Sequence, residues 1–110
     1  MALLIENFRD FTLQDDENNP RLGEIDMSGT KVKGTILAHG VVHFNSGVIG
    51  KKRFDSAGVH GDEVDGQYAV NNTINALIRG EIDLSSGEWL VAMGNILAIR
   101  NNVREVGFNL

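Results

Sequence analysis

The sequence predicts an all-β domain, built as a single antiparallel β-barrel or sandwich of about seven strands. Three features predict this fold. Apolar and polar side chains alternate along residues 30–44 and 67–84, as they do on half-buried strands. Ser-Gly turn sequences follow the alternating segments, as in hairpin loops. Glycines 34, 40 and 80 fall on the apolar face, where a missing side chain lets a strand coil or bulge.

The first alternating segment, residues 30–44, separates its residue types cleanly. No even position carries a charge, whereas the odd positions include Lys31, Lys33, His39 and His43. Successive side chains of a strand point to opposite faces. We therefore expect one buried face and one mostly solvated face over this segment.

The second segment allows two interpretations. Its even positions hold seven non-glycine apolar residues and its odd positions two, which favours a strand over 67–84. A short helix over 72–79 is the alternative, with Asn71 or Asn72 as its N-cap and Gly80 at its C-terminal end. Three asparagines also fit poorly in a strand. The N-terminal segment is similarly open, although Phe11-Thr12-Leu13 favours a strand over a helix.

Turn sequences divide the remainder of the chain. Ser28-Gly29, residues 45–47 (Asn-Ser-Gly) and residues 85–87 (Ser-Ser-Gly) each precede a further apolar or alternating segment. We expect them to be short hairpin loops. Residues 14–20 and 55–66 are polar and are expected to be longer loops.

Composition limits the class of protein. A chain of 110 residues with 42% hydrophobic residues fits one domain spanning 1–110. Cysteine is absent, which excludes disulfides and thiolate metal sites. A net charge of −5 argues against nucleic-acid binding, and no apolar run is long enough for a membrane span. Without a signal peptide, the expected location is cytoplasmic, with a virion as the alternative.

The sequence contains no diagnostic catalytic motif, and neither a metal site nor a cofactor is expected. His39 and His43 fall on the same face of one predicted strand, about 13 Å apart, which is too far for a shared metal ion. They remain the candidates for an acid/base role. His60 and Asp62 lie in the acidic loop, which we interpret as a solvated turn with ligand or calcium binding as the alternative.

The C-terminal third is apolar on both faces. A strand of this kind is either central in a core or covered by another subunit. We expect a homo-oligomer that uses this segment. Its predicted interface residues are Trp89, Val91, Met93, Leu97 and Ile99, and Trp89 is also a candidate for stacking on a ligand.

The expected function is therefore a non-enzymatic, self-associating β-domain that acts as a binding or structural module, of a phage, virion or mobile-element type. The alternative is a small barrel that encloses an apolar small molecule, as an isomerase or cyclase with His39 or His43 as the acid/base group. A calcium-binding acidic-loop protein is the third hypothesis.

Overall fold

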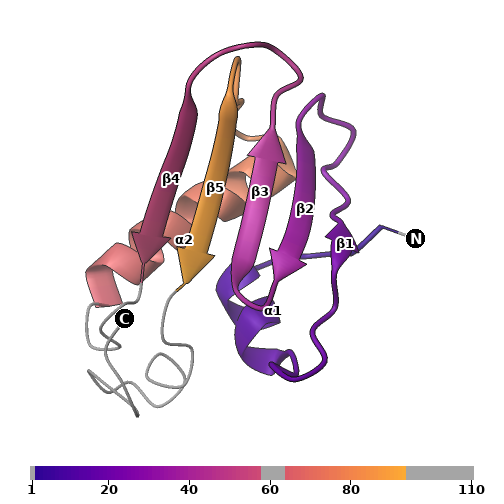
Figure 1. The fold of residues 1–110 in the computed structure, drawn as a ribbon, viewed down its shortest axis with the longest axis vertical. Helices are drawn as coiled ribbons and strands as arrows, with labels where there is room; N and C mark the ends of the chain where they lie inside the picture. Colours follow the sequence, from indigo (N-terminus) through magenta and orange to yellow (C-terminus); the bar gives the residue numbers. More distant parts are fainter. Residues whose placement is uncertain (1, 58–63, 94–110) are drawn as a thin grey trace.

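The computed structural model describes residues 2–57 and 64–93, and the statements below concern these residues. They form two helices and a five-stranded sheet (Figure 1). In chain order the elements are α1 (Phe8–Gln14), β1 (Gly23–Glu24), β2 (Lys33–Ala38), β3 (Val41–Asn45), β4 (Lys52–Ala57), α2 (Val64–Arg79) and β5 (Glu88–Met93).

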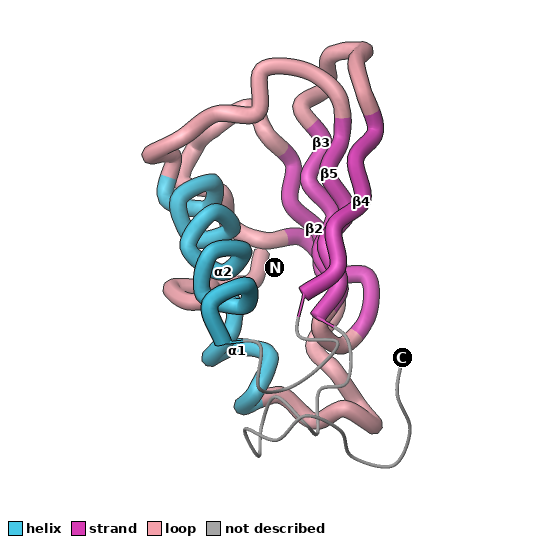
Figure 2. The backbone as a smooth tube through the Cα atoms, turned by 90° about the vertical axis from the view of Figure 1, so that its left-hand side faces the viewer, coloured by secondary structure: helices cyan, strands magenta, loops and turns pink. Residues whose placement is uncertain are grey.

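The sheet is open and mixed, so the predicted antiparallel barrel of about seven strands is wrong. Its strand order is β1-β2-β3-β5-β4, and β4 pairs with β5 in parallel while the other pairs are antiparallel. Both helices lie on the same face of the sheet (Figure 2). The fold is therefore α/β, with one face of the sheet covered by helices and the other open.

The parallel pair explains why the chain needs a long helix between β4 and β5. Antiparallel neighbours can be joined by two residues, but a parallel neighbour requires a crossover, which is usually helical. Here α2 makes that crossover and packs on the sheet (Figures 1 and 2). The loop from β3 to β4 passes over the end of β5 because β5 lies between those two strands.

The alternation predicted for residues 30–44 is confirmed in its buried face, although the segment is a hairpin and not one strand. Val32, Ile36, Val42 and Phe44 are all buried. The one-residue register shift between Ile36 and Ala38 brings Ile36 opposite Val42, so the even positions up to 36 and from 42 onward lie on the same side. Ala38 is exposed, because the register shifts by one residue between Ile36 and Ala38.

The strand predicted over residues 67–84 is wrong, and the helix alternative is right in type. The buried residues of α2 are Asn71, Ile74, Asn75, Leu77 and Ile78, which repeat at helical spacing. The helix also begins earlier than the alternative proposed. Ile82 and Leu84, which supported the strand count, lie beyond its end.

Gly80 ends α2 as the helix alternative predicted. Its φ of 74° is left-handed, which glycine adopts without a steric penalty. The Gly80 amide donates to the Leu77 carbonyl, and the Glu81 amide donates to the Ala76 carbonyl. This is the Schellman arrangement that satisfies the last carbonyls of a helix.

The strand favoured over residues 11–13 is also wrong, because these residues belong to α1. Three side-chain amides satisfy the free N–H groups of its first turn. Asn7 caps the helix and accepts from the Asp10 amide, while Asn71 and Asn75 of α2 accept from the Arg9 and Phe8 amides at 2.8 Å each. Two of the three asparagines that fit a strand poorly, Asn71 and Asn75, therefore attach one helix to the other.

The Ser-Gly sequences are turns, but only Ser28-Gly29 joins antiparallel neighbours, the strands β1 and β2. Residues 45–47 lead from β3 toward the non-adjacent β4, and residues 85–87 connect α2 to β5. The hairpin expectation fails at these two places because the strand order is not sequential.

The core lies between the helices and the covered face of the sheet. Phe8 of α1 and Ile74 of α2 are fully buried against Val42, Phe44 and Val91. In residues 2–57 and 64–93, no helix combines the length and hydropathy that crossing a lipid bilayer requires.

Replacing Asn75 by Ala should lower the free energy of unfolding by about 1–3 kcal/mol, because the buried Phe8 amide loses its acceptor. Asn72→Ala is the matched control, since Asn72 is exposed on the same helix and gains the same helix propensity. Urea unfolding followed by circular dichroism measures both. Equal stability of the two variants would contradict this role of Asn75.

Candidate functional site

The carboxyl ends of β4 and β5 lie side by side. In the parallel register Lys52 is opposite Glu88 and Ala57 is opposite Met93, so the two strands end together at one edge of the sheet (Figure 1). In open α/β sheets, ligands bind outside the carboxyl ends of parallel strands. We call this side of the sheet the ligand edge, because a ligand-binding site is expected here first. Residues 58–63 follow β4 at this edge and connect it to α2.

A cleft of about 560 Å³ lies along β4 on the helix-covered side of the sheet. Its apolar wall comes from Val70 and Leu77 of α2 and from Leu84. Charged residues of both signs also line it, among them Lys51, Arg53, Asp55 and Asp83. Because these charges are of both signs, the cleft favours neither a purely anionic nor a purely cationic ligand.

A hydrogen-bonded cluster lies in this cleft. The Trp89 indole Nε1 donates to Asp55 Oδ2 at 2.7 Å, and Arg53 Nε donates to the same oxygen at 2.7 Å. The indole bond, with a further contribution from the Arg53 guanidinium, holds the pKa of the Asp55 carboxyl below its ordinary value near 3.8, although partial burial opposes this shift. Trp89 also stacks on Phe44, with ring centroids 5.9 Å apart.

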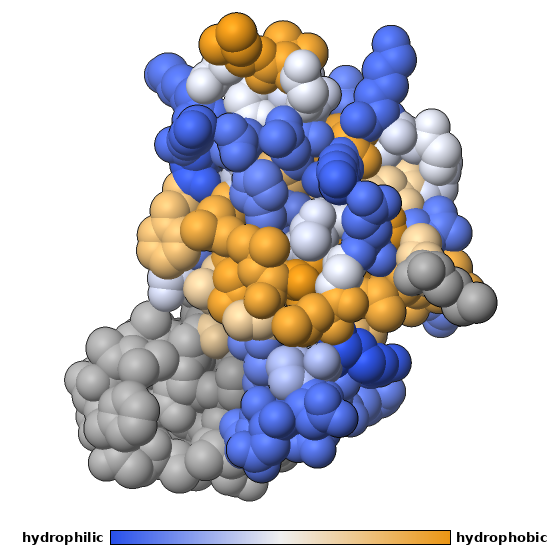
Figure 3. Space-filling view, turned by 45° about the vertical axis from the view of Figure 1, so that its right-hand side comes forward, coloured by the Kyte–Doolittle hydropathy of each residue, from blue (hydrophilic) through white to orange (hydrophobic). Residues whose placement is uncertain are grey.

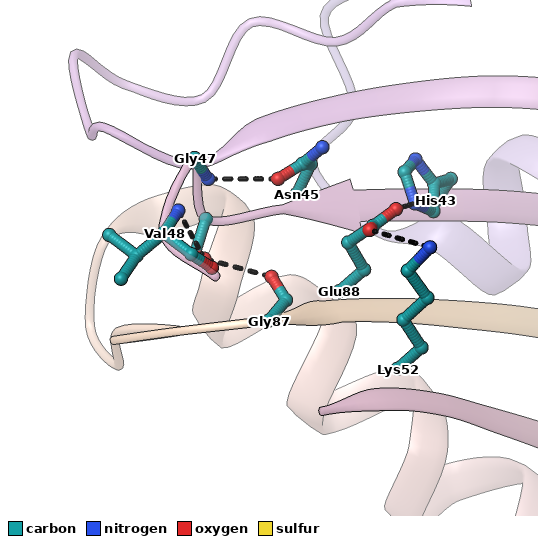
Figure 4. A network of polar contacts seen from close by, with 8 residues as sticks. His43, Asn45, Gly47, Val48, Lys52, Gly87 and Glu88 are labelled. Carbon is teal, nitrogen blue, oxygen red and sulfur yellow. Dashed lines mark hydrogen bonds and ion pairs between the residues drawn. The ribbon is translucent and has the colours of Figure 1, made fainter. Parts of the chain in front are cut away.

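The open face of the sheet carries a second polar cluster. His43 Nε2 lies 2.8 Å from Glu88 Oε1, and Lys52 Nζ lies 3.7 Å from Glu88 Oε2 (Figure 4). These side chains project from β3, β5 and β4, near the end of the sheet opposite the carboxyl ends of β4 and β5. The cluster links β3, β5 and β4 and lies away from the expected ligand edge.

Close backbone contact joins the loop after β3 to the start of β5. The Gly87 amide donates to the Val48 carbonyl at 2.8 Å, and the Ser46 hydroxyl donates to the Gly87 carbonyl at 2.8 Å. Gly87 has a φ of 77°, and a Cβ there would collide with the Lys51 carbonyl oxygen. Only glycine fits this position, where the β3–β4 loop crosses β5.

The residues predicted as acid/base candidates occupy different elements. His39 lies in the turn between β2 and β3, and its Nε2 is 2.8 Å from the Thr12 carbonyl oxygen. His43 lies in β3 and is bound to Glu88. The prediction that both share one strand is therefore wrong, and the structure does not bring them together.

The other predicted site residues divide into two groups. Val91 and Met93 are buried in the core, and Trp89 is partly buried against it. The predicted interface residues Leu97 and Ile99 and the predicted ligand residues His60 and Asp62 lie outside the described residues. The interface stays a prediction.

Sequence reasoning missed the Arg53–Asp55–Trp89 cluster. The sequence predicts a loop over residues 55–66, which is wrong at both ends, because β4 extends to Ala57 and α2 begins at Val64. The alternation of Lys52, Phe54 and Ser56 with Arg53 and Asp55 is the only local sign of a strand there. The hydrogen bond between Asp55 and Trp89 joins residues 34 positions apart, which no local sequence pattern reveals. Within the described part of the chain, no three His, Cys, Asp or Glu side chains gather as metal ligands would.

Comparison with known proteins identifies the class of this fold and then the family. A β-α-β unit in a mixed sheet, with polar residues beside its parallel pair, is an arrangement of α/β enzymes. Residues 50–110, which include β4, α2 and β5, match the succinylglutamate desuccinylase/aspartoacylase catalytic domain. The match covers more than half of the chain. The chain belongs to this family.

Solved structures agree with this assignment. The succinylglutamate desuccinylase of Chromobacterium violaceum superposes with a TM-score of 0.81 at 25% identity, over 96% of this chain and 32% of that one. The Vibrio cholerae enzyme gives 0.79 at 21% identity, over 99% and 32%. The Vibrio parahaemolyticus protein gives 0.77 at 19% identity, over 98% and 37%. The chain thus spans about a third of these relatives, and no curated protein matches it.

These matches correct the functional expectation. The predicted non-enzymatic binding or structural module is wrong, because the family model describes the catalytic domain of a hydrolase-type enzyme. The alternative hypothesis, a small barrel that encloses an apolar ligand, is also wrong, because the sheet is open and mixed.

Protonation of Asp55 should be visible in the fluorescence of Trp89, the only tryptophan. Because folding lowers the pKa of Asp55, its carboxylate stabilises the fold at pH values above the ordinary pKa of an aspartate. This stabilisation is lost as the pH falls through the lowered pKa. Asp55→Asn should thus lower the urea midpoint at neutral pH and have no effect in strong acid.

Asp83→Asn is the control for this titration, because Asp83 lines the same cleft without bonding to the indole. It should leave the acid transition of the Trp89 emission in place. An unchanged transition in Asp55→Asn would show that another group produces it.

Proposed function

We propose that this chain forms part of the catalytic domain of an amidohydrolase that removes an acyl group from an N-acylated acidic amino acid. The observation that carries the proposal is the family match over residues 50–110, which covers the β4-α2-β5 unit and its ligand edge. Desuccinylases of succinylglutamate and aspartoacylases both release an acidic amino acid from an acyl group, as their names state.

The proposed reaction is hydrolysis of one amide bond. The oxygen of a water molecule attacks the acyl carbonyl carbon, the carbon–nitrogen bond breaks, and the amine leaves with a proton. The products are a carboxylate and a free amino acid. Such a reaction requires a group that activates the water and a donor that stabilises the negative charge on the carbonyl oxygen.

The residues best suited to this chemistry are His60, Asp62 and Glu63. They follow β4 in the chain and precede α2, so the chain enters them at the carboxyl edge of the parallel pair. Their imidazole and carboxylate groups are the types that act as general acids and bases. Residues 60–63 thus replace His39 and His43 as the acid/base candidates.

Water can also be activated by a bound metal ion. His60 and Glu63 offer a nitrogen and carboxylate oxygens, the donor types that zinc takes in catalytic sites with three protein ligands. Within the described residues no three His, Cys, Asp or Glu side chains form such a group. A bound ion would polarise the amide carbonyl and lower the pKa of the attacking water.

His60→Ala and Glu63→Gln should each lower kcat/KM by about 10²-fold or more, because a general acid or base contributes about 10²–10⁴-fold. The measurement uses a polypeptide that carries the complete catalytic domain, with N-succinylglutamate and N-acetylaspartate as substrates. His43→Gln is the matched control, since His43 is bound to Glu88 on the open face of the sheet. It should leave kcat/KM nearly unchanged.

Chelation distinguishes a metal-dependent form of this proposal from one that uses a general base alone. Loss of activity on chelation, with recovery on adding zinc, would support a metal ion at His60 and Glu63, whereas resistance to chelation would support a general base. Full activity of both variants, or no release of amino acid from either substrate by the unmodified protein, would contradict the proposal.

A further inference from the structure

The cleft along β4 has the size and the composition of a small-molecule site. Its volume of about 560 Å³ falls in the range of about 300–1,000 Å³ that is usual for ligand pockets. Such pockets have mostly apolar walls and a few polar groups that fix the orientation of the ligand. The proposed hydrolysis assigns no role to this cleft, because its acid/base candidates lie in residues 60–63.

Side chains that are anchored in the core form the apolar wall of the cleft. Leu77 is buried, and Val70, Leu84 and Trp89 are partly buried against the core. Ile82 also lines the cleft and is 45% exposed, so apolar surface there is left uncovered by the described part of the chain. The wall is therefore in place before a ligand arrives.

Apolar side chains are also exposed on the opposite side of the sheet, but they are arranged differently. Figure 3 shows them as a band on the open face, with polar side chains above and below it. In the cleft, the charged side chains of Arg53 and Asp55 project from β4 beside the apolar wall. The cleft therefore offers both kinds of contact to one ligand.

The charged pair Arg53 and Asp55 has hydrogen-bonding groups that the protein does not use. Arg53 Nε and Trp89 Nε1 both donate to Asp55 Oδ2, at 2.7 Å each. A guanidinium has five N–H donors, and a carboxylate has two acceptor oxygens. Within residues 2–57 and 64–93, no hydrogen bond or ion pair involves Asp55 Oδ1 or the two terminal nitrogens of Arg53. These groups are available to a ligand.

An adjacent carboxylate oxygen and guanidinium are complementary to the two charged groups that every free amino acid carries. An ammonium group donates to a carboxylate, and a guanidinium binds a carboxylate through two parallel N–H···O bonds. We propose that the cleft binds a free α-amino acid with an apolar side chain, whose ammonium donates to Asp55 Oδ1 and whose carboxylate accepts from the Arg53 guanidinium. The side chain of this ligand packs on Val70, Leu77 and Leu84. Such a ligand has no net charge, in agreement with the mixed charges of the cleft.

The Asp55 carboxylate is prepared for this role in the free protein. The Trp89 hydrogen bond, with a smaller contribution from Arg53, lowers the pKa of Asp55, so the carboxylate keeps its charge at neutral pH. The same two bonds hold its orientation, which reduces the entropy that binding must cost. Because all these residues lie outside 60–63, amino-acid binding does not rest on the proposed hydrolysis.

The test titrates the 110-residue chain with L-leucine and follows the emission of Trp89, the only tryptophan. We expect a saturable change. Three matched compounds each lack one group: N-acetyl-L-leucine the ammonium, L-leucinamide the carboxylate, and glycine the apolar side chain. Each should bind about tenfold or more weakly than L-leucine. No saturable change up to about 10 mM L-leucine, equal binding of the matched compounds, or tighter binding of L-glutamate would overturn the proposal.

Two substitutions test the charged pair itself. Arg53→Gln and Asp55→Asn should each weaken L-leucine binding by about tenfold or more, because each removes one charge-assisted hydrogen bond. Arg79→Gln is the matched control, since Arg79 pairs with Glu81 at the end of α2 and should leave the affinity unchanged. The Arg53 side chain is 75% exposed, so Arg53→Gln should fold even if Asp55→Asn does not. Unchanged affinity in Arg53→Gln would contradict the proposal.

Calorimetry repeats the titration in a polypeptide that carries the complete catalytic domain. L-leucine should bind there with the same order of affinities among the matched compounds. Loss of binding in this longer polypeptide would overturn the proposal, because the cleft would then be occupied by other parts of the protein. No readout depends on turnover, so failure of the proposed activity and failure of this site are distinguishable.

Discussion

The parallel pairing of β4 with β5 is the constraint on which the rest of this fold depends. Two adjacent parallel strands cannot be joined directly, so the chain must leave the sheet and return along a helix. That helix, α2, then buries Ile74 and Ile78 on one face of the sheet and provides Asn71 and Asn75 to cap α1. The core, the position of the first helix and the ligand edge of the sheet all follow from one pair of strands.

Local patterns predicted the hairpin face but not the architecture. Alternation over 30–44 was informative because the register shift between Ile36 and Ala38 brings Ile36 opposite Val42 on the buried side. Alternation over 67–84 misled because Ile74 and Ile78, four residues apart, fit both a period of two and the buried face of a helix. The asparagines were the better guide there, since buried amides at 71 and 75 need partners that α1 provides.

The candidate site was harder to predict than the fold because its parts are distant in the sequence. His60 and Asp62 stand out as a histidine and a carboxylate in one loop, yet nothing local shows that this loop begins where two parallel strands end. The adjacency of Ala57 and Met93 arises from the strand order. These residues therefore gained a functional interpretation only once the ends of β4 and β5 were known to be adjacent.

The β2–β3 turn limits how this chain can vary in length. Ile36 and Val42 share the buried side because the one-residue register shift between Ile36 and Ala38 follows the two-residue turn. Inserting one residue at Gly40 would turn Val42 and Phe44 outward and His43 inward, against the helices. Inserting two would restore the phase. Homologous sequences should accordingly tolerate gaps here only in multiples of two, unless a second bulge absorbs the odd residue.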